Sequence, residues 1–222
     1  LISCGRGLPY ATAGKLRLFR LPSLEPVPWS ERLPKDVGAA AFHPERDVLV
    51  TGGWSGDIRL WNRNSGQELP SIMKQSSRIY TMSFSPVEPN LLAATGGDRS
   101  IHLWEMMASQ KERARLHGAS EELSELAFSP DGQTIATGGM DTPITLWDAG
   151  QTKAEIIEVH TESRNCVLGF SENGRQLVTI DATGGVMYRD PTSLAVLDTV
   201  CQVDMKSALA SPPAVDFLVI AL

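Results

Sequence analysis

Apolar and polar residues alternate over short stretches along most of the chain, and turns rich in glycine, proline and aspartate separate these stretches. One part of the chain shows four such stretches in succession: residues 122–129 (ELSELAFS), 133–139 (QTIATGG), 144–148 (ITLWD) and 153–159 (KAEIIEV). Alternation with a period of two is typical of β-strands that bury one face. Between the first two stretches, Asp131 and Gly132 suit a hairpin turn because both tolerate a positive φ. We therefore predict four antiparallel strands, named a to d, in this unit.

The same pattern recurs along the chain with a nearly constant period. Its glycine-rich segments are VTGGWSGDIRLWN (50–62), ATGGDRSIHLWE (94–105), ATGGMDTPITLWD (136–148) and VTIDATGGVMYRD (178–190), with a weaker copy, GKLRLFR (14–20). The aromatic residues that close them are Phe19, Trp61, Trp104, Trp147 and Tyr188, at steps of 42, 43, 43 and 41 residues. Four strands in a repeat of about 40–45 residues are typical of a propeller blade.

A second motif precedes each complete copy. Its phenylalanines are Phe42, Phe84, Phe128 and Phe170, at steps of 42, 44 and 42 residues, and a further copy begins at Leu209. Two independent motifs that keep one period through four copies are not a chance coincidence. One twisted four-stranded sheet cannot bury both of its faces, whereas sheets stacked around an axis can.

The chain resembles the WD-repeat β-propeller family. The resemblance rests on the FSPDG turn at 128–132, the ATGG turns and the terminal LWD or LWN, and it covers nearly the whole chain. It implies an all-β fold: a WD-repeat β-propeller of four-stranded antiparallel blades, with four complete repeats and partial blades at both ends. We expect no helix longer than two turns between Val37 and Thr199.

The period also predicts where the blades begin and end within a single propeller domain, 1–222. The expected segments are a partial blade at 1–36, complete blades at about 37–78, 79–120, 121–162 and 163–204, and a partial blade at 205–222. In the first segment, KLRLF (15–19) is the expected strand c, LEPVPW (24–29) the expected strand d, and LISCG (1–5) either strand a or b. Because family propellers most often have about seven blades, we expect a fragment of a larger one. The alternative is a five-bladed ring, closed by pairing of the two partial blades.

The resemblance also implies a structural tetrad of hydrogen-bonded side chains in the best-preserved blade. Family blades join a histidine before strand a, a serine or threonine on strand b, an aspartate in the b–c turn and a tryptophan on strand c. The matching residues here are His117, Thr137, Asp141 and Trp147. A satisfied buried network of this kind fixes one packing arrangement.

The other copies match the tetrad only in part. The second copy offers Thr95, Asp98 and Trp104 without a histidine. In the first copy, Thr51 and Trp61 are present, and Ser55 takes the place of the acid. The fourth copy has His160 and Thr179, with Thr183 in the place of the acid and Tyr188 in that of the tryptophan.

The face formed by the b–c turns and d–a loops is the expected partner-binding surface. In WD-repeat proteins the residue before the turn acid is often exposed there, which corresponds to Trp54, Gly97 and Met140. Trp54 stands among small turn residues, and tryptophan is enriched among residues that dominate interface energies. We predict partner-binding roles for Trp54, Arg99 and Met140. The alternative for Trp54 is an indole folded back over its own blade.

Composition changes this picture little. The 26 acidic and 20 basic residues give a net charge of −6, which argues against nucleic acid or an anionic membrane as the main partner. The three cysteines make neither a disulfide framework nor a metal-ligand spacing, so we expect no metal and a reducing compartment, cytoplasmic or nuclear. The sequence contains no stretch of about 18 consecutive apolar residues of the kind that spans a membrane.

No local motif indicates catalysis. The histidines lack metal-ligand spacing: His43 is expected in a turn, His102 between blades, and His117 and His160 in tetrads. The glycine pairs end strands rather than open helices, so no phosphate loop is implied. We therefore expect no enzyme, cofactor or small-molecule substrate, but an interaction scaffold for a protein or peptide partner. The alternatives are a regulatory propeller domain of a larger kinase, protease or ATPase and, more remotely, a hydrolase with a site in the central channel.

Overall fold

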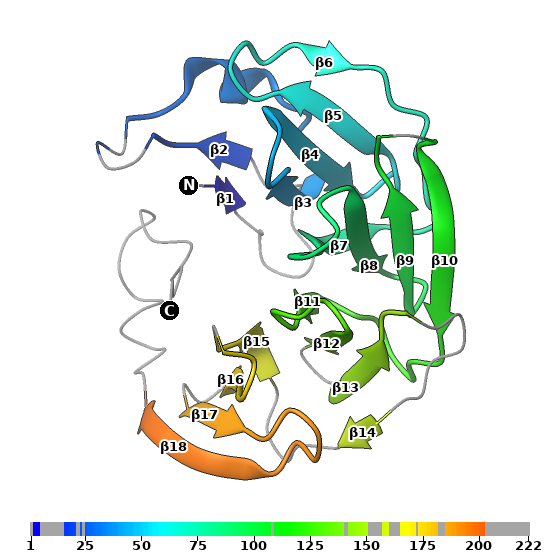
Figure 1. Ribbon diagram of the computed structural model, residues 1–222. Helices are drawn as coiled ribbons and strands as arrows, with labels where there is room; N and C mark the ends of the chain where they lie inside the picture. Colours follow the sequence, from blue (N-terminus) through cyan, green and yellow to red (C-terminus); the bar gives the residue numbers. More distant parts are fainter. Residues whose placement is uncertain are drawn as a thin grey trace.

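The fold is all-β. The computed structural model describes residues 2–4, 16–20, 23, 25–107, 109–139, 142–150, 157–159, 165–171, 173–181 and 185–202. Sixteen strands of the described residues form four antiparallel sheets of four strands each, and two more form a small sheet. These sheets are arranged in an arc around a common axis, with their first strands toward the centre (Figure 1).

Each four-stranded sheet follows the chain in order, so its strands correspond to a, b, c and d of one repeat. Blade 1 consists of β3 (Val37–Phe42), β4 (Val48–Gly53), β5 (Ile58–Asn62) and β6 (Glu68–Leu69). Blade 2 consists of β7 (Ile79–Phe84), β8 (Leu91–Gly96), β9 (Ser100–Glu105) and β10 (Lys111–His117). Blade 3 consists of β11 (Glu125–Phe128), β12 (Thr134–Gly139), β13 (Thr142–Asp148) and β14 (Ile157–Val159). Blade 4 consists of β15 (Asn165–Phe170), β16 (Leu177–Asp181), β17 (Gly185–Arg189) and β18 (Val196–Gln202).

The N-terminal segment differs from its prediction at one element. β1 (Ile2–Cys4) pairs with β2 (Leu16–Leu18), so the first strand has the place of strand b and the second that of strand c. The expected strand d at 24–29 is shorter than predicted. Residues 25–27 lie antiparallel to the end of β2, with a bridge between Phe19 and Pro26 and hydrogen bonds from Arg20 N–H to the Glu25 carbonyl and from Val27 N–H to the Leu18 carbonyl. The 3-10 helix η1 (Pro28–Arg32) follows. The strand ends there because Pro28 suits the first turn of a helix and the Leu18 N–H donates to Ser30 Oγ instead of continuing the ladder.

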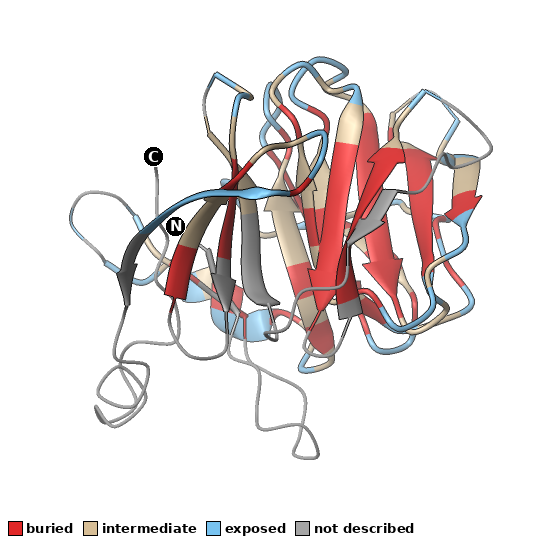
Figure 2. Ribbon diagram, turned by 90° about the horizontal axis from the view of Figure 1, so that it is seen from below, coloured by how far each residue is buried: buried red, intermediate tan, exposed pale blue. Residues whose placement is uncertain are grey.

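The interiors of blades 1 and 2 are buried because each of these sheets is covered on both faces by its neighbours. All six residues of β4 and all six of β8 are buried, whereas exposed residues lie mostly in turns and in outer strands such as β18 (Figure 2). This is the expected result of a row of stacked sheets and not of a sheet with one solvated face. Between Val37 and Thr199, the described residues contain no helix, in agreement with the prediction.

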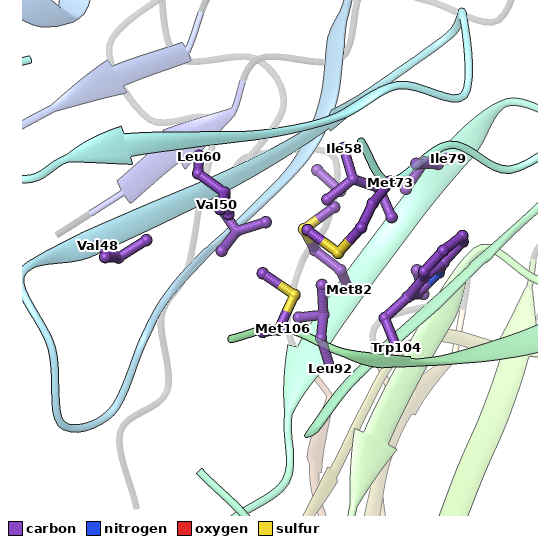
Figure 3. Close-up of a cluster of buried hydrophobic side chains, with 12 residues drawn as sticks. Val48, Val50, Ile58, Leu60, Met73, Ile79, Met82, Leu92, Trp104 and Met106 are labelled. Atoms are coloured by element: carbon purple, nitrogen blue, oxygen red, sulfur yellow. The ribbon is translucent and has the colours of Figure 1, made fainter. Parts of the chain in front are cut away.

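The largest apolar cluster lies between blades 1 and 2 (Figure 3). Val50 and Ile58 from blade 1 meet Ile79, Met82 and Trp104 from blade 2. A tryptophan on strand c thus faces the preceding blade: Trp147 lies in the cluster between blades 2 and 3, and Trp61 faces the N-terminal sheet. Burial of one large apolar side chain stabilises the folded protein by about 1.5–3 kcal/mol. Because these side chains are buried between blades, the blades depend on one another for stability. The expected strands of 205–222 lie outside the described residues, and both the partial blade and the ring closure stay predictions.

Candidate binding surface

The b–c turns and d–a loops share one face of the molecule, because strands alternate in direction within each blade. Trp54 lies on this face, in the turn between β4 and β5, with 44% of its surface exposed. Its backbone N–H donates to the Asp36 carbonyl over 3.0 Å, which ties the turn to the loop before β3. The Cδ1 atom of its ring is 3.6 Å from where a Cβ on Gly38 would stand. The indole therefore leans over its own blade while much of it stays open to solvent.

Arg78 covers Trp54 from the next blade. The guanidinium carbon lies 4.9 Å from the centre of the indole ring, within the range of a cation–π contact. Arg78 is exposed, and none of the described carboxylates lies within 4.0 Å of it. The guanidinium thus lies over the indole and also interacts with the Tyr80 hydroxyl. These contacts pre-orient a side chain that would otherwise be mobile.

Arg99 occupies the b–c turn of blade 2. Its φ of 60° is in the left-handed region, which a non-glycine residue adopts rarely and at a cost of about 1 kcal/mol or more. Its Nη1 donates to the Ser120 carbonyl over 3.3 Å, in the loop that enters blade 3. The exposed arginine therefore joins the turn of one blade to the loop of the next.

Tyr80 and Glu122 form a second connection between blades 2 and 3. The Tyr80 hydroxyl donates to Glu122 Oε2 over 2.8 Å, and a Cβ on Gly97 would lie 3.7 Å from both side chains. Burial, followed by the hydrogen bond to Glu122, raises the pKa of the Tyr80 hydroxyl above its usual value, so it remains a donor at neutral pH. We define Trp54, Arg78, Tyr80, Arg99 and Glu122 as the candidate binding surface. The other predicted binding residue, Met140, lies outside the described residues.

Two members of the predicted tetrad meet in blade 3. Trp147 Nε1 donates to Thr137 Oγ1 over 2.7 Å, and both side chains are buried. His117 ends β10 in blade 2, where its Nδ1 is 2.9 Å from Ser100 Oγ. Asp141 lies outside the described residues, so the tetrad as a unit stays a prediction.

The Thr–Trp pair recurs in blade 1 and is altered in blade 4. Trp61 Nε1 donates to Thr51 Oγ1 over 2.8 Å. In blade 4, Arg189 and not Tyr188 has the place of the tryptophan, since it pairs with Leu177 and its Nε donates to Thr179 Oγ1 over 3.2 Å. The sequence-based match to Tyr188 is wrong by one position, because it followed the aromatic residue instead of the distance from the threonine.

Blade 2 also departs from its predicted match. Thr51 and Thr137 precede their tryptophans by ten residues, but Thr95 precedes Trp104 by nine. The side chain of Thr95 consequently points to the other face of the sheet, where its hydroxyl donates to the Leu123 carbonyl over 2.8 Å. Ala94 stands on the tryptophan side instead, and Trp104 Nε1 is buried without a partner among the described residues. Counting back from the tryptophan would have found this shift in the sequence.

His43 confirms its expected place in a turn. The side chain is buried, and its Nδ1 accepts hydrogen bonds from the backbone N–H groups of Glu45 and Arg46 over 3.1 and 3.2 Å. Ser85 Oγ accepts the corresponding bonds in blade 2. The imidazole thus replaces a serine hydroxyl as the acceptor that closes the a–b turn.

The opposite face, which carries the a–b and c–d turns, contains an open groove of about 560 Å³ between blades 2, 3 and 4. Its walls include the ion pair of Arg113 with Glu88, together with Asp131 and Asp148. The described part of the chain contains no group of three or more His, Cys, Asp or Glu side chains placed to hold a metal ion. None of the described helices is long and apolar enough to span a membrane.

This chain belongs to the WD-repeat family. The family model "WD domain, G-beta repeat" matches residues 32–62, 66–105 and 110–148, which lie on blades 1 to 3 and the segments that enter them. The arrangement of four-stranded antiparallel sheets around an axis agrees with that family's propeller fold.

Several curated proteins are similar to parts of this chain. Coronin-7 of Rattus norvegicus is 30% identical over 182 residues, which cover 71% of this chain and 19% of that protein. The B-type cell cycle switch protein ccs52B of Medicago truncatula is 34% identical over 116 residues, covering 50% and 24%. A periodic tryptophan protein 2 homolog of Dictyostelium discoideum is 25% identical over 137 residues, covering 61% and 15%. The chain thus spans less than a quarter of the length of each of these relatives.

Proposed function

We propose that this chain is a non-catalytic scaffold that binds a protein or peptide partner through its b–c turns and d–a loops. The observation that carries the proposal is Trp54, a large indole that is 44% exposed in a turn of otherwise small residues. Tryptophan is among the residues that most often dominate the energy of a protein interface. An exposed indole on a rigid turn is a suitable anchor because little conformational entropy is lost when a partner covers it.

The contacts across the blades support the same face. Trp54 with Arg78, Tyr80 with Glu122, and Arg99 with Ser120 each join neighbouring blades through side chains on this face. Such contacts hold the aromatic and charged groups in fixed positions before a partner arrives. We propose that Arg99, together with Met140 of blade 3, flanks Trp54 in the interface.

The family membership supports an interaction role, since WD-repeat propellers mostly present such surfaces to other proteins. The alternative proposal is a regulatory propeller within a larger enzyme. It is compatible with the comparisons because the chain matches less than a quarter of the length of each relative named above. The cytoplasm or nucleus is the proposed location, on the basis of the cysteine content alone.

The test begins with capture of partners by the full-length protein and their identification by mass spectrometry. The affinity of each purified partner is then measured for the unchanged protein and for Trp54→Ala. We expect the substitution to weaken binding by ~2 kcal/mol, or about 30-fold, without changing the melting temperature.

Val87→Ala is the matched control, because Val87 is an apolar residue that is 55% exposed in an a–b turn on the opposite face. It should leave affinity unchanged. If Trp54→Ala lowers the melting temperature and binds every captured partner as tightly as before, the indole is structural and the proposed surface is wrong.

A further inference from the structure

His102 on β9 is completely buried, yet both of its ring nitrogens face carboxylates. Nε2 is 2.7 Å from Asp98 Oδ2, and Nδ1 is 2.8 Å from Glu112 Oε1. An ionised carboxylate only accepts hydrogen bonds, and a neutral imidazole has one N–H to donate. A ring that carries a proton on each nitrogen satisfies both contacts, whereas a neutral ring leaves one carboxylate facing a lone pair.

Glu112 is held in its ionised form. Arg115 donates from Nε and Nη2 to the two carboxylate oxygens over 2.7 and 2.9 Å. This pairing with Arg115, reinforced by His102, keeps the pKa of the Glu112 carboxyl below its usual value. The proton between His102 Nδ1 and Glu112 therefore lies on the ring and not on the carboxylate.

Asp98 depends on the ring for its side-chain hydrogen bond. Its Oδ1 atom is buried and has no partner among the described residues, and its Oδ2 faces His102 alone. Three charged side chains are linked to His102 in this series of ion pairs. Asp98 from the b–c turn and Glu112 from β10 contact the ring, and Arg115 from β10 contacts Glu112. With the ring doubly protonated, the four groups sum to zero charge, which is the arrangement that a low-dielectric site favours.

His43 shows the opposite arrangement in the same molecule. Its Nδ1 accepts from two backbone N–H groups, so that nitrogen carries no proton. Its Nε2 then donates to Asn90 Oδ1 over 3.2 Å, as a neutral ring does. The neighbours of His43 thus fit a ring with one proton, whereas those of His102 fit a ring with two.

We propose that His102 is a doubly protonated donor that holds the turn between β8 and β9 and so positions Arg99 on the candidate binding surface. Asp98 immediately precedes Arg99, whose left-handed backbone needs an anchored turn to persist. His102 acts through Asp98 and does not touch a partner, so it is a positioning residue. The effect on partner binding rests on the proposed function, but the protonation of His102 and the anchoring of the turn are properties of the free protein.

The protonation is tested by ¹⁵N labelling of histidine and long-range ¹H–¹⁵N correlation at neutral pH. We expect both ring nitrogens of His102 in the range of protonated nitrogens, and one protonated and one unprotonated nitrogen for His43. Substitution of each histidine by glutamine assigns the signals. An unprotonated nitrogen on His102 in the unchanged protein overturns the proposal.

Asp98→Asn provides the discriminating variant. An asparagine amide can donate to Nε2, so a neutral ring suffices and Nε2 should move to the unprotonated range while His43 stays the same. If His102 keeps both protons opposite the amide, the Asp98 carboxylate is not the reason for them, and the proposal fails.

Anchoring is measured by ¹⁵N relaxation of the backbone amides of the free chain. In His102→Gln we expect the order parameter of Arg99 to fall from the rigid range near about 0.85 to below about 0.6, while that of Trp54 is unchanged. An unchanged value at Arg99 overturns the positioning role. Because no partner is present, this outcome is independent of whether Trp54→Ala weakens binding.

Discussion

Some buried hydrogen bonds in this chain are present or absent according to a difference of one residue in the length of a turn. A threonine accepts from the tryptophan indole in blades 1 and 3, but one residue fewer in the turn of blade 2 puts Ala94 in that place. Trp104 then keeps a buried N–H without an acceptor among the described residues. An unsatisfied buried group of this kind costs about 1–3 kcal/mol.

Ala94→Ser should stabilise the protein. The serine hydroxyl would stand where Thr51 and Thr137 stand in their blades and would accept from Trp104 Nε1, with an expected gain of about 1 kcal/mol. Ala93→Ser is the control, because Ala93 lies in the apolar cluster on the other face of β8 and offers its hydroxyl no such donor. Urea midpoints compare the two variants. A lower midpoint for Ala94→Ser than for the unchanged protein would contradict the assignment of this position.

The tetrad of blade 3 predicts a second difference between single residues. Asp141→Ala should lower stability more than Ser55→Ala, by roughly 1–3 kcal/mol, because it would leave a buried polar partner unsatisfied. Ser55 is exposed and bonds to Asp36 and Asp57 at the surface. Equal denaturation midpoints for the two variants would show that Asp141 does not complete the network.

At the scale of elements, strand d of blade 2 is stabilised by charge in addition to its ladder hydrogen bonds. β10 carries Glu112 and Arg115 toward the buried His102, while Arg113 on the same strand pairs with Glu88 at the surface. A partly buried pair that reaches a buried group is screened less by solvent than an exposed pair. The two pairs on one strand should therefore differ in their response to pH.

Arg115→Met should lower stability at neutral pH and lose its effect in acid. The pKa of Glu112 is lowered in the folded protein, chiefly by Arg115, so its ionised form stabilises the fold above the ordinary value of 4.5. That contribution disappears as the pH falls through the lowered pKa, because Glu112 is then protonated in the folded and unfolded states. Urea midpoints at a series of pH values should show the variant and the unchanged protein converging in acid.

Arg113→Met is the control on the same strand, since both members of its pair are about half exposed. Such a pair contributes little at any pH, so its midpoint should follow that of the unchanged protein throughout. A gap for Arg115→Met that stays constant from neutral to acidic pH would mean that packing of the arginine stem, and not the pairing with Glu112, stabilises β10.

For the molecule as a whole, stability depends on how closely each blade approaches the next. The middle strands are buried on both faces, and side chains of the next blade come close to the backbone at glycines such as Gly52. A Cβ on Gly52 would collide with Met82 and Ile79 of the next blade. Within blade 2, a Cβ on Gly96 at the end of β8 would collide with the Arg78 carbonyl, which directly precedes β7. Both collisions lie at the end of strand b.

Gly96→Ala should strongly destabilise the protein, because the Arg78 carbonyl belongs to the backbone and cannot move aside as a flexible side chain can. We expect a cost of about 1–3 kcal/mol from overpacking. Gly169→Ala is the matched control within a strand, since no atom of the described residues lies within 4 Å of its Cβ position. Thermal unfolding measures both. A melting temperature of Gly96→Ala equal to that of Gly169→Ala would contradict this close approach between β8 and the residue before β7.

The sequence by itself determined the fold class, the antiparallel four-stranded units and the place of the turns. The period of two within strands and the period of about 42 residues between repeats depend on local geometry and on burial, which the order of residues records directly. It did not determine how short strand d at the N-terminus is, where Pro28 opens η1 directly after the bridge between Phe19 and Pro26.

Only the tertiary structure decided which side chains meet. Arg78 lies over Trp54, Tyr80 reaches Glu122, and His102 lies between Asp98 and Glu112. These partners come from neighbouring strands or blades, at sequence separations that no local pattern fixes. A one-residue change in a turn also reverses which face a side chain occupies, so Thr95 resembles Thr51 in the sequence and not in its contacts. The physical reason is that a hydrogen bond depends on distances of tenths of an ångström, whereas a hydrophobic pattern tolerates much larger displacements.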